Sequence, residues 1–433
     1  MNQSVRTNLR RILILPLAAV ALTGAVACGS SKTSSTASST KPADRTACVA
    51  DVDKVIATMP TPASTTAALP ADLLAKLDAA AQSSFKEAAA PGAIVGVRTP
   101  QGTWTQAYGV ADPAAGTPMA VGMHTRIGSV TKTFTGTAIM QLAQQGKLSL
   151  DDVIEKYVPG VPNGNRIPLR LLANMTSGVA SYTASTKFTD TYFAHPETIF
   201  VPDQLIAVGI AESPIFEPGA KFNYSNTNTI LLGKVIEKVT GQPVAEVFQK
   251  QIFDPLKLAN TSWPGDSTAI PDPYPQGFTL QGDTATPDKP SNATNWNPAW
   301  GWTAGEIISN MDDLLTYGRA LATGQGMLDA TTQAERLNSI PAPAGYGIAL
   351  GCIGGWVGHT GELPGYNTSV FHDTMTDSTV IVQTNSDIAS GNCPESPTVT
   401  DDPRDAVCSS PATRMFVALS TALGHTFTPL PQK

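Results

Sequence analysis

The stretch Arg126-Ile127-Gly128-Ser129-Val130-Thr131-Lys132-Thr133-Phe134 decides the fold of this 433-residue chain. If it opens a helix, Ser129 and Lys132 share one face about a turn apart, because residues three apart in a helix are neighbours. An amine then lies beside a hydroxyl, and a neutral amine can take the hydroxyl proton and leave a nucleophilic oxygen. The stretch therefore indicates acyl transfer at Ser129.

The Ser-x-x-Lys spacing is weak evidence by itself. The chain contains it twice more, at Ser38/Lys41 in a Ser/Thr-rich segment and at Ser83/Lys86 in a predicted surface helix. The argument for Ser129 depends on two further motifs that each occur once.

Tyr224-Ser225-Asn226 is the first of these motifs, and it precedes an apolar helix. Lys132, or an ionised Tyr224, can act as a base if burial or a neighbouring cation lowers its pKa. The Asn226 side chain can grip a substrate amide by donating and accepting at once.

His359-Thr360-Gly361 is the second motif, on a predicted strand. We expect His359 to serve as a proton relay or electrostatic partner, and Thr360 as a hydroxyl donor. Gly361 is expected to leave room for a substrate along the strand edge. The backbone N–H groups of Ser129 and Glu362 are expected to form an oxyanion hole.

With these three motifs in this order, the chain resembles the penicillin-recognising serine hydrolases: DD-peptidases, class C β-lactamases and related esterases. Their motifs are Ser-x-x-Lys, Tyr-x-Asn and Lys/His-Thr/Ser-Gly. Arg126-Ile127-Gly128, Thr176-Ser177-Gly178 and Trp302–Gly305 add to the likeness, which covers roughly residues 89–424.

The resemblance implies that Ser129 is acylated, that Lys132 and Tyr224 share the base and acid roles, and that Asn226 orients the substrate. It implies no cofactor. His359 replaces the lysine that is more usual in the third motif, as in DD-peptidases and esterases more often than in dedicated β-lactamases. The resemblance therefore favours a task other than antibiotic destruction.

Glu362 departs from what a DD-carboxypeptidase needs. A substrate carboxylate beside it would be repelled by about 1 kcal/mol in water and by more when partly buried, and no arginine occurs between Ala342 and Asp401. Thr360 alone could still bind a carboxylate, or Glu362 could point away. We expect an ester or a non-carboxylate amide as substrate.

Two other functions stay open. One is a non-catalytic envelope lipoprotein that binds peptidoglycan or a protein partner through the same cleft, and the other is a true β-lactamase. The sequence lacks the Gly-x-Ser-x-Gly elbow of α/β-hydrolases and any phosphate-binding glycine loop. Trp300, Trp302 and Tyr366 are candidates for a substrate groove or for plain packing, and Glu306 is interpreted as a helix-start residue. Oligomeric state stays open.

Periodicity predicts an α/β (α+β) fold, with an antiparallel sheet flanked by helices and an all-α lobe at about 150–325. A helix at 70–90 and strands at 93–98 and 103–109 precede the lobe. Strands at 345–351, 355–359, 367–372 and 378–384 and a helix at 411–424 follow it. The hydrolase domain is predicted at 45–433.

The N-terminus is interpreted as a targeting segment. Three arginines precede the apolar run 12–27, which ends in Ala25-Val26-Ala27-Cys28 and resembles a lipoprotein cleavage site with Cys28 as the lipid attachment point. Ordinary secretion without a lipid is the alternative. Residues 28–44 are Ser/Thr-rich and predict a tether. We expect an exported protein on the outer face of the cell membrane, held through its lipid.

Charge and cysteine content agree with export. The chain carries a net charge of −7, and loss of residues 1–27 removes three arginines and no acids, which leaves about −10 and argues against nucleic acid as a partner. We expect a small-molecule or peptide substrate. No metal motif occurs, so no metal is expected. Four cysteines allow three pairings, of which we favour Cys48–Cys352 with Cys393–Cys408.

Overall fold

The computed structural model describes residues 47–58, 67–282, 284–342, 344–391, 393 and 408–429. All of them belong to one compact unit, residues 45–433. The expected signal segment, Cys28 and the tether at 28–44 lie outside the described residues. Within the described part, no helix combines the length and apolar character needed to cross a membrane.

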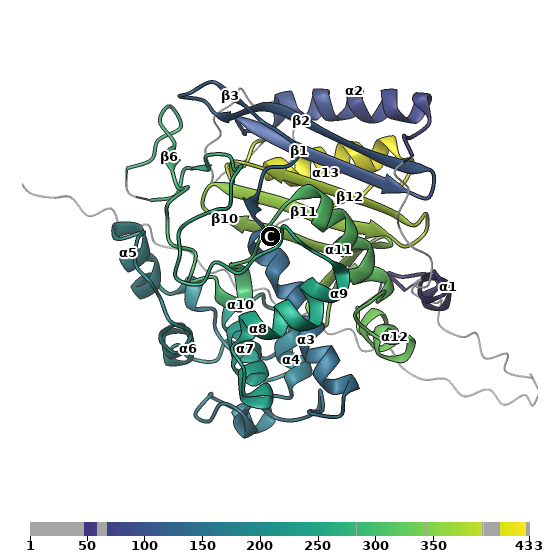
Figure 1. Ribbon diagram of the computed structural model, residues 1–433. Helices are drawn as coiled ribbons and strands as arrows, with labels where there is room; N and C mark the ends of the chain where they lie inside the picture. Colours follow the sequence, from purple (N-terminus) through teal and green to yellow (C-terminus); the bar gives the residue numbers. More distant parts are fainter. Residues whose placement is uncertain are drawn as a thin grey trace, which may run out of the picture. The chain divides into compact units, whose positions relative to one another are not determined.

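An eight-stranded sheet in the order β3-β2-β1-β12-β11-β10-β9-β8 forms the centre of this unit, with antiparallel pairing throughout. This confirms the predicted fold class (Figure 1). The strands are β1 (Gly92–Thr99), β2 (Gly102–Asp112), β3 (Thr117–Pro118), β8 (Ala344–Gly347), β9 (Leu350–Ile353), β10 (Trp356–Leu363), β11 (Tyr366–Asp373) and β12 (Ser378–Thr384).

Helices cover both faces of the sheet. On one face, α2 (Ala71–Glu87) and α13 (Pro411–Ala422) bury the side chains of alternate strand residues such as Val95 and Val382. On the other, α11 (Met311–Thr323) and α3 (Thr131–Gln144) pack over the residues in between, such as Ile94 and Ile381. Successive strand residues point to opposite faces, so each strand contributes to both cores.

The region at 150–325 is mainly helical, although it contains three short strands and its last helix, α11, packs on the sheet. Its helices are α4 (Leu169–Ala173), α5 (Thr186–Ala194), α6 (Pro202–Ala211), α7 (Asn226–Thr240), α8 (Val244–Phe248), α9 (Asp254–Leu256) and α10 (Trp302–Gly305), and its strands are β5 (Phe278–Thr279), β6 (Ser291–Asn292) and β7 (Ile308–Ser309), the last paired with β4 (Thr125–Arg126). Short 3₁₀ or π segments cover Gly128–Val130, Ile154–Lys156, Gly164–Arg166, Tyr182–Ala184 and Gln249–Phe253.

The strand predicted at 345–351 is instead the hairpin of β8 and β9. The chain reverses at Ile348 and Ala349, where Ala349 adopts a left-handed φ of 50°. The alternation of side chains between the two faces of the sheet continues on both sides of a two-residue turn. The sequence pattern therefore does not reveal the turn. β10 also runs four residues beyond the predicted end at His359, to Leu363.

Both favoured disulfides are present. Cys48–Cys352 joins the segment before α1 (Val52–Ala57) to β9, and Cys393–Cys408 closes a loop before α13.

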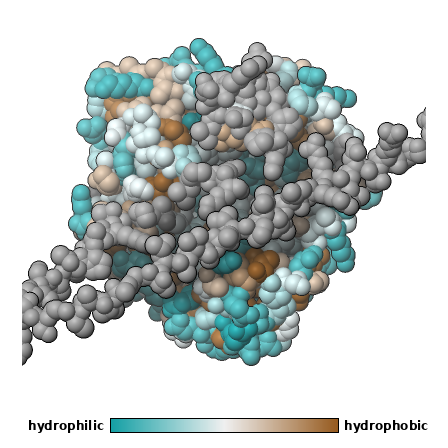
Figure 2. Space-filling view, turned by 180° about the vertical axis from the view of Figure 1, so that it is seen from behind, coloured by the Kyte–Doolittle hydropathy of each residue, from teal (hydrophilic) through white to brown (hydrophobic). Residues whose placement is uncertain are grey.

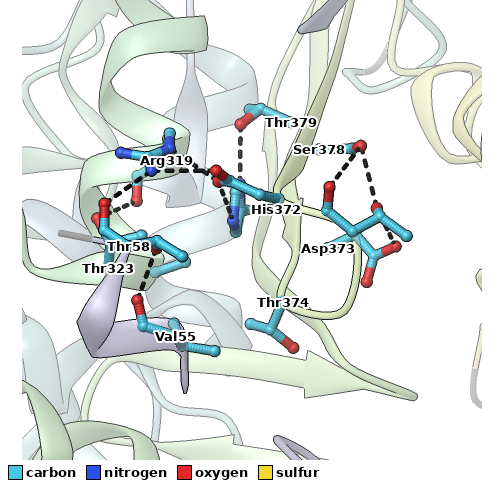
Figure 3. A network of polar contacts seen from close by, with 12 residues as sticks. Val55, Thr58, Arg319, Thr323, His372, Asp373, Thr374, Ser378 and Thr379 are labelled. Atoms are coloured by element: carbon cyan, nitrogen blue, oxygen red, sulfur yellow. Dashed lines mark hydrogen bonds and ion pairs between the residues drawn. The ribbon is translucent and has the colours of Figure 1, made fainter. Parts of the chain in front are cut away.

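A buried polar network fixes the same N-terminal segment to the sheet (Figure 3). Arg319 of α11 donates to the Thr58 carbonyl (2.9 Å) and pairs with both carboxylate oxygens of Asp377 (2.8 and 3.1 Å). His372 of β11 donates to or accepts from Thr379 Oγ1 (2.9 Å). The network also involves the acidic turn between β11 and β12. Separately, α12 (Ala330–Asn338) packs beside α1.

From behind, teal and white residues dominate the uncovered surface, with brown ones in small patches (Figure 2). Seven large apolar or aromatic side chains are exposed among the described residues, of which Phe222 and Tyr224 lie at the site described next; the others are Leu74, Ile199, Val201, Ile215 and Met375.

Candidate active site

Ser129 lies in the 3₁₀ turn that leads into α3, and Lys132 occupies the first turn of that helix. Lys132 Nζ is 3.0 Å from Ser129 Oγ and donates to the carbonyl oxygen of Ala304 in α10 (2.7 Å). The lysine is fully buried, and its desolvation holds the pKa of the amine well below the usual value. A neutral amine therefore lies within reach of the Ser129 proton.

Two glycines allow β10 to approach the Ser129 turn closely. A Cβ atom on Gly361 would lie 1.9 Å from the carbonyl oxygen of Ile127, and one on Gly128 would lie 2.4 Å from the amide nitrogen of Glu362. Gly361 is thus needed for this backbone packing. It also lines the cavity described below, so its expected role in leaving room for a substrate stays a prediction. This close packing brings the backbone N–H groups of Ser129 and Glu362 near one another, as an oxyanion hole requires.

Tyr224 lies beside this pair, just before α7. Its ring centre is 4.9 Å from Lys132 Nζ. Although the residue keeps 37 % of its surface exposed, desolvation raises the pKa of the Tyr224 hydroxyl, and a hydrogen bond with Ser129 offsets this only in part. Tyr224 is therefore a neutral phenol that can donate a proton, and the alternative of an ionised Tyr224 as base is disfavoured.

Asn226, the first residue of α7, is held by the turn at Tyr182–Ala184. Its Nδ2 donates to Thr183 Oγ1 (2.9 Å), and its backbone N–H donates to Ser181 Oγ (3.0 Å). Oδ1 has no hydrogen-bond partner among the described residues. The second N–H of Nδ2 and the Oδ1 acceptor are left for a substrate amide, so the expected grip that donates and accepts at once stays a prediction.

His359 is neutral in this site. It is buried, and that burial together with the nearby Lys132 lowers the pKa of the imidazole to about 3. Nδ1 hydrogen-bonds the carbonyl oxygen of Thr360, so it carries the proton, and Nε2 must accept from the Tyr346 hydroxyl at 3.0 Å. Both ring nitrogens are occupied, which argues against the expected proton relay and against a positive charge.

Tyr346 of β8 was not found from the sequence. Its ring packs edge-on against both Tyr224 (6.1 Å between centres) and His359 (5.5 Å). Burial raises the pKa of its hydroxyl, so it remains a donor. The sequence signal that could have indicated Tyr346 is an aromatic residue between Gly345 and Gly347 in a predicted strand.

A cavity of about 660 Å³ opens on these residues. It extends from Tyr224 and His359 along β10 towards α13, and Thr360 and Glu362 are the β10 residues exposed to it. Much of its remaining wall is apolar, with Phe222, Tyr346, Ile353, Phe371, Phe427 and Pro429. A bulky apolar group beside a polar reacting centre suits this shape.

The aromatic residues proposed for a groove are mostly packing residues. Trp302 and Tyr366 are buried, and the Tyr366 hydroxyl donates to the Pro275 carbonyl (2.9 Å). Trp300 borders a separate small cavity beside Arg126. Glu306 is not at a helix start either: it follows α10, is buried, and has a pKa raised well above the usual value by that burial.

Glu362 lines the cavity, and Asp387 is a second acid whose charge acts on it. Burial raises the pKa of Glu362 to about 8 and that of Asp387 to about 6, and the Asp387 charge raises that of Glu362 further. Within the described residues, no group of three or more His, Cys, Asp or Glu side chains could hold a metal ion.

Comparison with known proteins gives consistent likenesses. The profile of the Beta-lactamase family matches residues 71–394. A D-aminopeptidase of Brucella anthropi is 29% identical over 65% of this chain and 54% of its own length, and the putative penicillin-binding protein PbpX of Bacillus subtilis is 27% identical over 56% of each. The chain therefore spans a little over half the length of these curated relatives.

Solved structures extend the likeness. A D-stereospecific amidohydrolase from Streptomyces sp. superposes with a TM-score of 0.65 at 33% identity, over 71% of this chain and 94% of that one. A D-amino acid amidase from Ochrobactrum anthropi SV3, complexed with L-phenylalanine, gives a TM-score of 0.63 at 25% identity, over 71% and 92% of the two chains.

Proposed function

Because the chain belongs to the beta-lactamase family of serine hydrolases, we propose that it hydrolyses amides or short peptides of D-amino acids through an acyl-enzyme on Ser129. The observation that carries the proposal is the 3.0 Å approach of Lys132 Nζ to Ser129 Oγ, with the amine desolvated. The names of the D-aminopeptidase and D-amidohydrolase relatives support the substrate class.

In the acylation step, the Lys132 amine takes the Ser129 proton while Oγ bonds to the substrate carbonyl carbon. The amides of Ser129 and Glu362 donate to the oxygen that becomes negative. Tyr224 protonates the leaving nitrogen as the C–N bond breaks, and regains its proton from the Lys132 ammonium. Asn226 Oδ1 accepts a substrate N–H.

In the deacylation step, water attacks the ester carbon and gives its proton to the Lys132–Tyr224 pair. The C–O bond to Ser129 then breaks, and Oγ takes a proton back. Apart from the substrate and water, both steps are written with groups of the chain alone.

The reactivity of Ser129 is tested by measuring the intact mass of residues 45–433 after treatment with a fluorophosphonate. Ser129→Ala is the control. A Ser129-dependent adduct supports the proposal. Absence of any adduct favours the envelope lipoprotein that only binds. The same experiment with benzylpenicillin, followed by the rate at which the adduct is lost, distinguishes a β-lactamase, which deacylates rapidly.

Export as a lipoprotein is also part of the proposal, with Cys28 as the lipid-bearing residue and residues 45–433 as the hydrolase domain. The two disulfides support an oxidising compartment. Metabolic labelling with an alkyne fatty acid should mark the wild type and not Cys28→Ser. Equal labelling of the wild type and Cys28→Ser would contradict lipid attachment at Cys28.

A further inference from the structure

The turn at Tyr182–Ala184 and the start of α7 are fixed to one another. Tyr182 is buried, its backbone N–H donates to Thr227 Oγ1 (3.0 Å), and its hydroxyl donates to the Trp300 carbonyl (2.6 Å). The Tyr182 ring also packs edge-on against Phe188, with 5.2 Å between the ring centres. The two residues that flank Tyr182 therefore keep a constant place beside the first turn of α7.

Ser181 and Thr183 are these flanking residues, and their hydroxyl oxygens lie 2.8 Å apart. Ser181 Oγ accepts from the backbone N–H of Asn226 (3.0 Å), whereas Thr183 Oγ1 accepts from Asn226 Nδ2 (2.9 Å). One hydroxyl thus holds the backbone of Asn226, and the other holds its side-chain amide. This arrangement leaves Asn226 Oδ1 available to a substrate.

Ser181 also replaces the usual helix cap. The first N–H groups of a helix have no partner within the helix, and a serine at the N-cap commonly accepts from one of them. Ser225 occupies the N-cap of α7, yet it makes no such bond, and its Oγ is buried without a hydrogen-bond partner among the described residues. The start of α7 is instead held by the Ser181 hydroxyl, from a segment 45 residues earlier in the chain.

The contact with Thr183 orders the Asn226 amide before a substrate arrives. A side chain that is free to rotate must be ordered on binding, which lowers affinity by about 2- to 10-fold. A flip of the amide would also exchange Oδ1 for Nδ2 and place a donor against the substrate N–H. The hydrogen bond from Nδ2 to Thr183 opposes both losses. Tyr224, two residues before Asn226, has its ring centre 4.9 Å from Lys132 Nζ, so the ordered amide belongs to the segment that carries the reacting groups.

We propose that Thr183 is a positioning residue, which holds the Asn226 amide with Oδ1 available to a substrate N–H, and that Ser181 fixes the backbone beneath this amide. The inference rests on the proposed function. It adds to the three motifs a residue from the turn before α5 that determines how tightly the substrate binds.

The test is a double-mutant cycle on the hydrolysis of D-phenylalanine p-nitroanilide. Thr183→Val keeps the shape of the side chain and removes the hydroxyl, so KM should rise by about 3- to 10-fold, as the loss of one hydrogen bond predicts. The Asn226 contact is made in both the ground state and the transition state, so kcat should change by less than about twofold. In the Asn226→Ala background, Thr183→Val should change kcat/KM by less than about twofold, because the two residues act as a unit.

Two further variants serve as controls. Thr183→Ser retains the hydroxyl and should restore KM to within about twofold of the wild type. Thr186→Val makes the same chemical change as Thr183→Val at an exposed residue that begins α5, and KM should not change. If Thr183→Val does not fold, Thr183→Ala gives the same comparison.

Equal effects of Thr183→Val in both backgrounds would overturn the positioning role, and so would a Thr183→Ser variant that behaves like Thr183→Val. Fluorophosphonate labelling of wild-type Ser129 separates the two proposals. Labelling together with equal effects overturns only the role of Thr183. Labelling without hydrolysis of the anilide overturns the proposed substrate class and this inference with it, and absence of labelling overturns the serine mechanism as well.

Discussion

Tyr346 donates a hydrogen bond to His359 Nε2 at 3.0 Å, and the opposite ring nitrogen is occupied by the Thr360 carbonyl. The imidazole is therefore fixed in one tautomer, with no free proton for Tyr224. We expect His359 to act as a positioning residue that holds the third motif beside the site.

Tyr346→Phe should leave the buried Nε2 of His359 without a donor, which is expected to lower the free energy of unfolding by about 1–3 kcal/mol. It should also reduce kcat several-fold while KM changes less. Urea unfolding and steady-state kinetics measure the two effects. A variant as stable and as active as the wild type would show that the contact does not position His359.

Ser129→Ala should lower kcat/KM by about 10³-fold or more. Lys132→Met should do the same, since it removes the base while keeping the apolar stem. Because only the neutral amine of Lys132 accepts a proton, kcat/KM should fall towards acidic pH in the wild type. Ser83→Ala is the matched control: Ser83 and Lys86 share the spacing but are exposed on α2, so activity should not change.

Gly361→Ala should reduce kcat/KM by about 100-fold or more. The added Cβ would meet the Ile127 carbonyl at 1.9 Å and push β10 away from the Ser129 turn, and loss of one oxyanion donor has an effect of this size. Gly122→Ala, where nothing lies within 4 Å of the added atom, should be neutral. Similar kinetics for both variants would contradict the close backbone packing.

Two buried histidines should make the protein less stable in acid. Burial lowers the pKa of His359 to about 3 and that of His372 to about 4. The unfolded chain binds protons below about pH 6.5, so stability should decline as pH falls from about 6.5 towards 4. The slope is up to about 1.4 kcal/mol per pH unit for each histidine.

Urea unfolding from pH 7.5 to 4.5 measures this decline. His372→Gln should give a shallower slope than the wild type, whereas His195→Gln, at a side chain that is 68% exposed, should not. Identical slopes for wild type and His372→Gln would rule out His372 as a contributor.

Loss of the Cys48–Cys352 disulfide, in a double serine variant, should lower stability by about 2–4 kcal/mol, because it removes a constraint on the unfolded chain. The N-terminal segment should then become more accessible to protease while Arg319 still holds Thr58. Limited proteolysis and thermal unfolding test this, and an unchanged midpoint would contradict it.

The sequence by itself determined the class of fold and the three motifs. Ser129 and Lys132 are one helical turn apart, and that distance depends on local geometry alone. Strand alternation and the turn residues predicted most of the sheet, since these signals act over a few residues. The hairpin at β8–β9 was missed because alternation is unchanged on both sides of a two-residue turn.

Only the tertiary structure decided which side chains of the site are charged and why Gly128 and Gly361 are needed. The pKa of Lys132 is lowered because the surrounding fold removes water from it, and His359 is neutral because burial and the nearby Lys132 lower the pKa of its imidazole. Asp387 reaches the vicinity of Glu362 only through the pairing of β10, β11 and β12. Burial and proximity depend on residues far apart in the chain, which local sequence patterns do not encode.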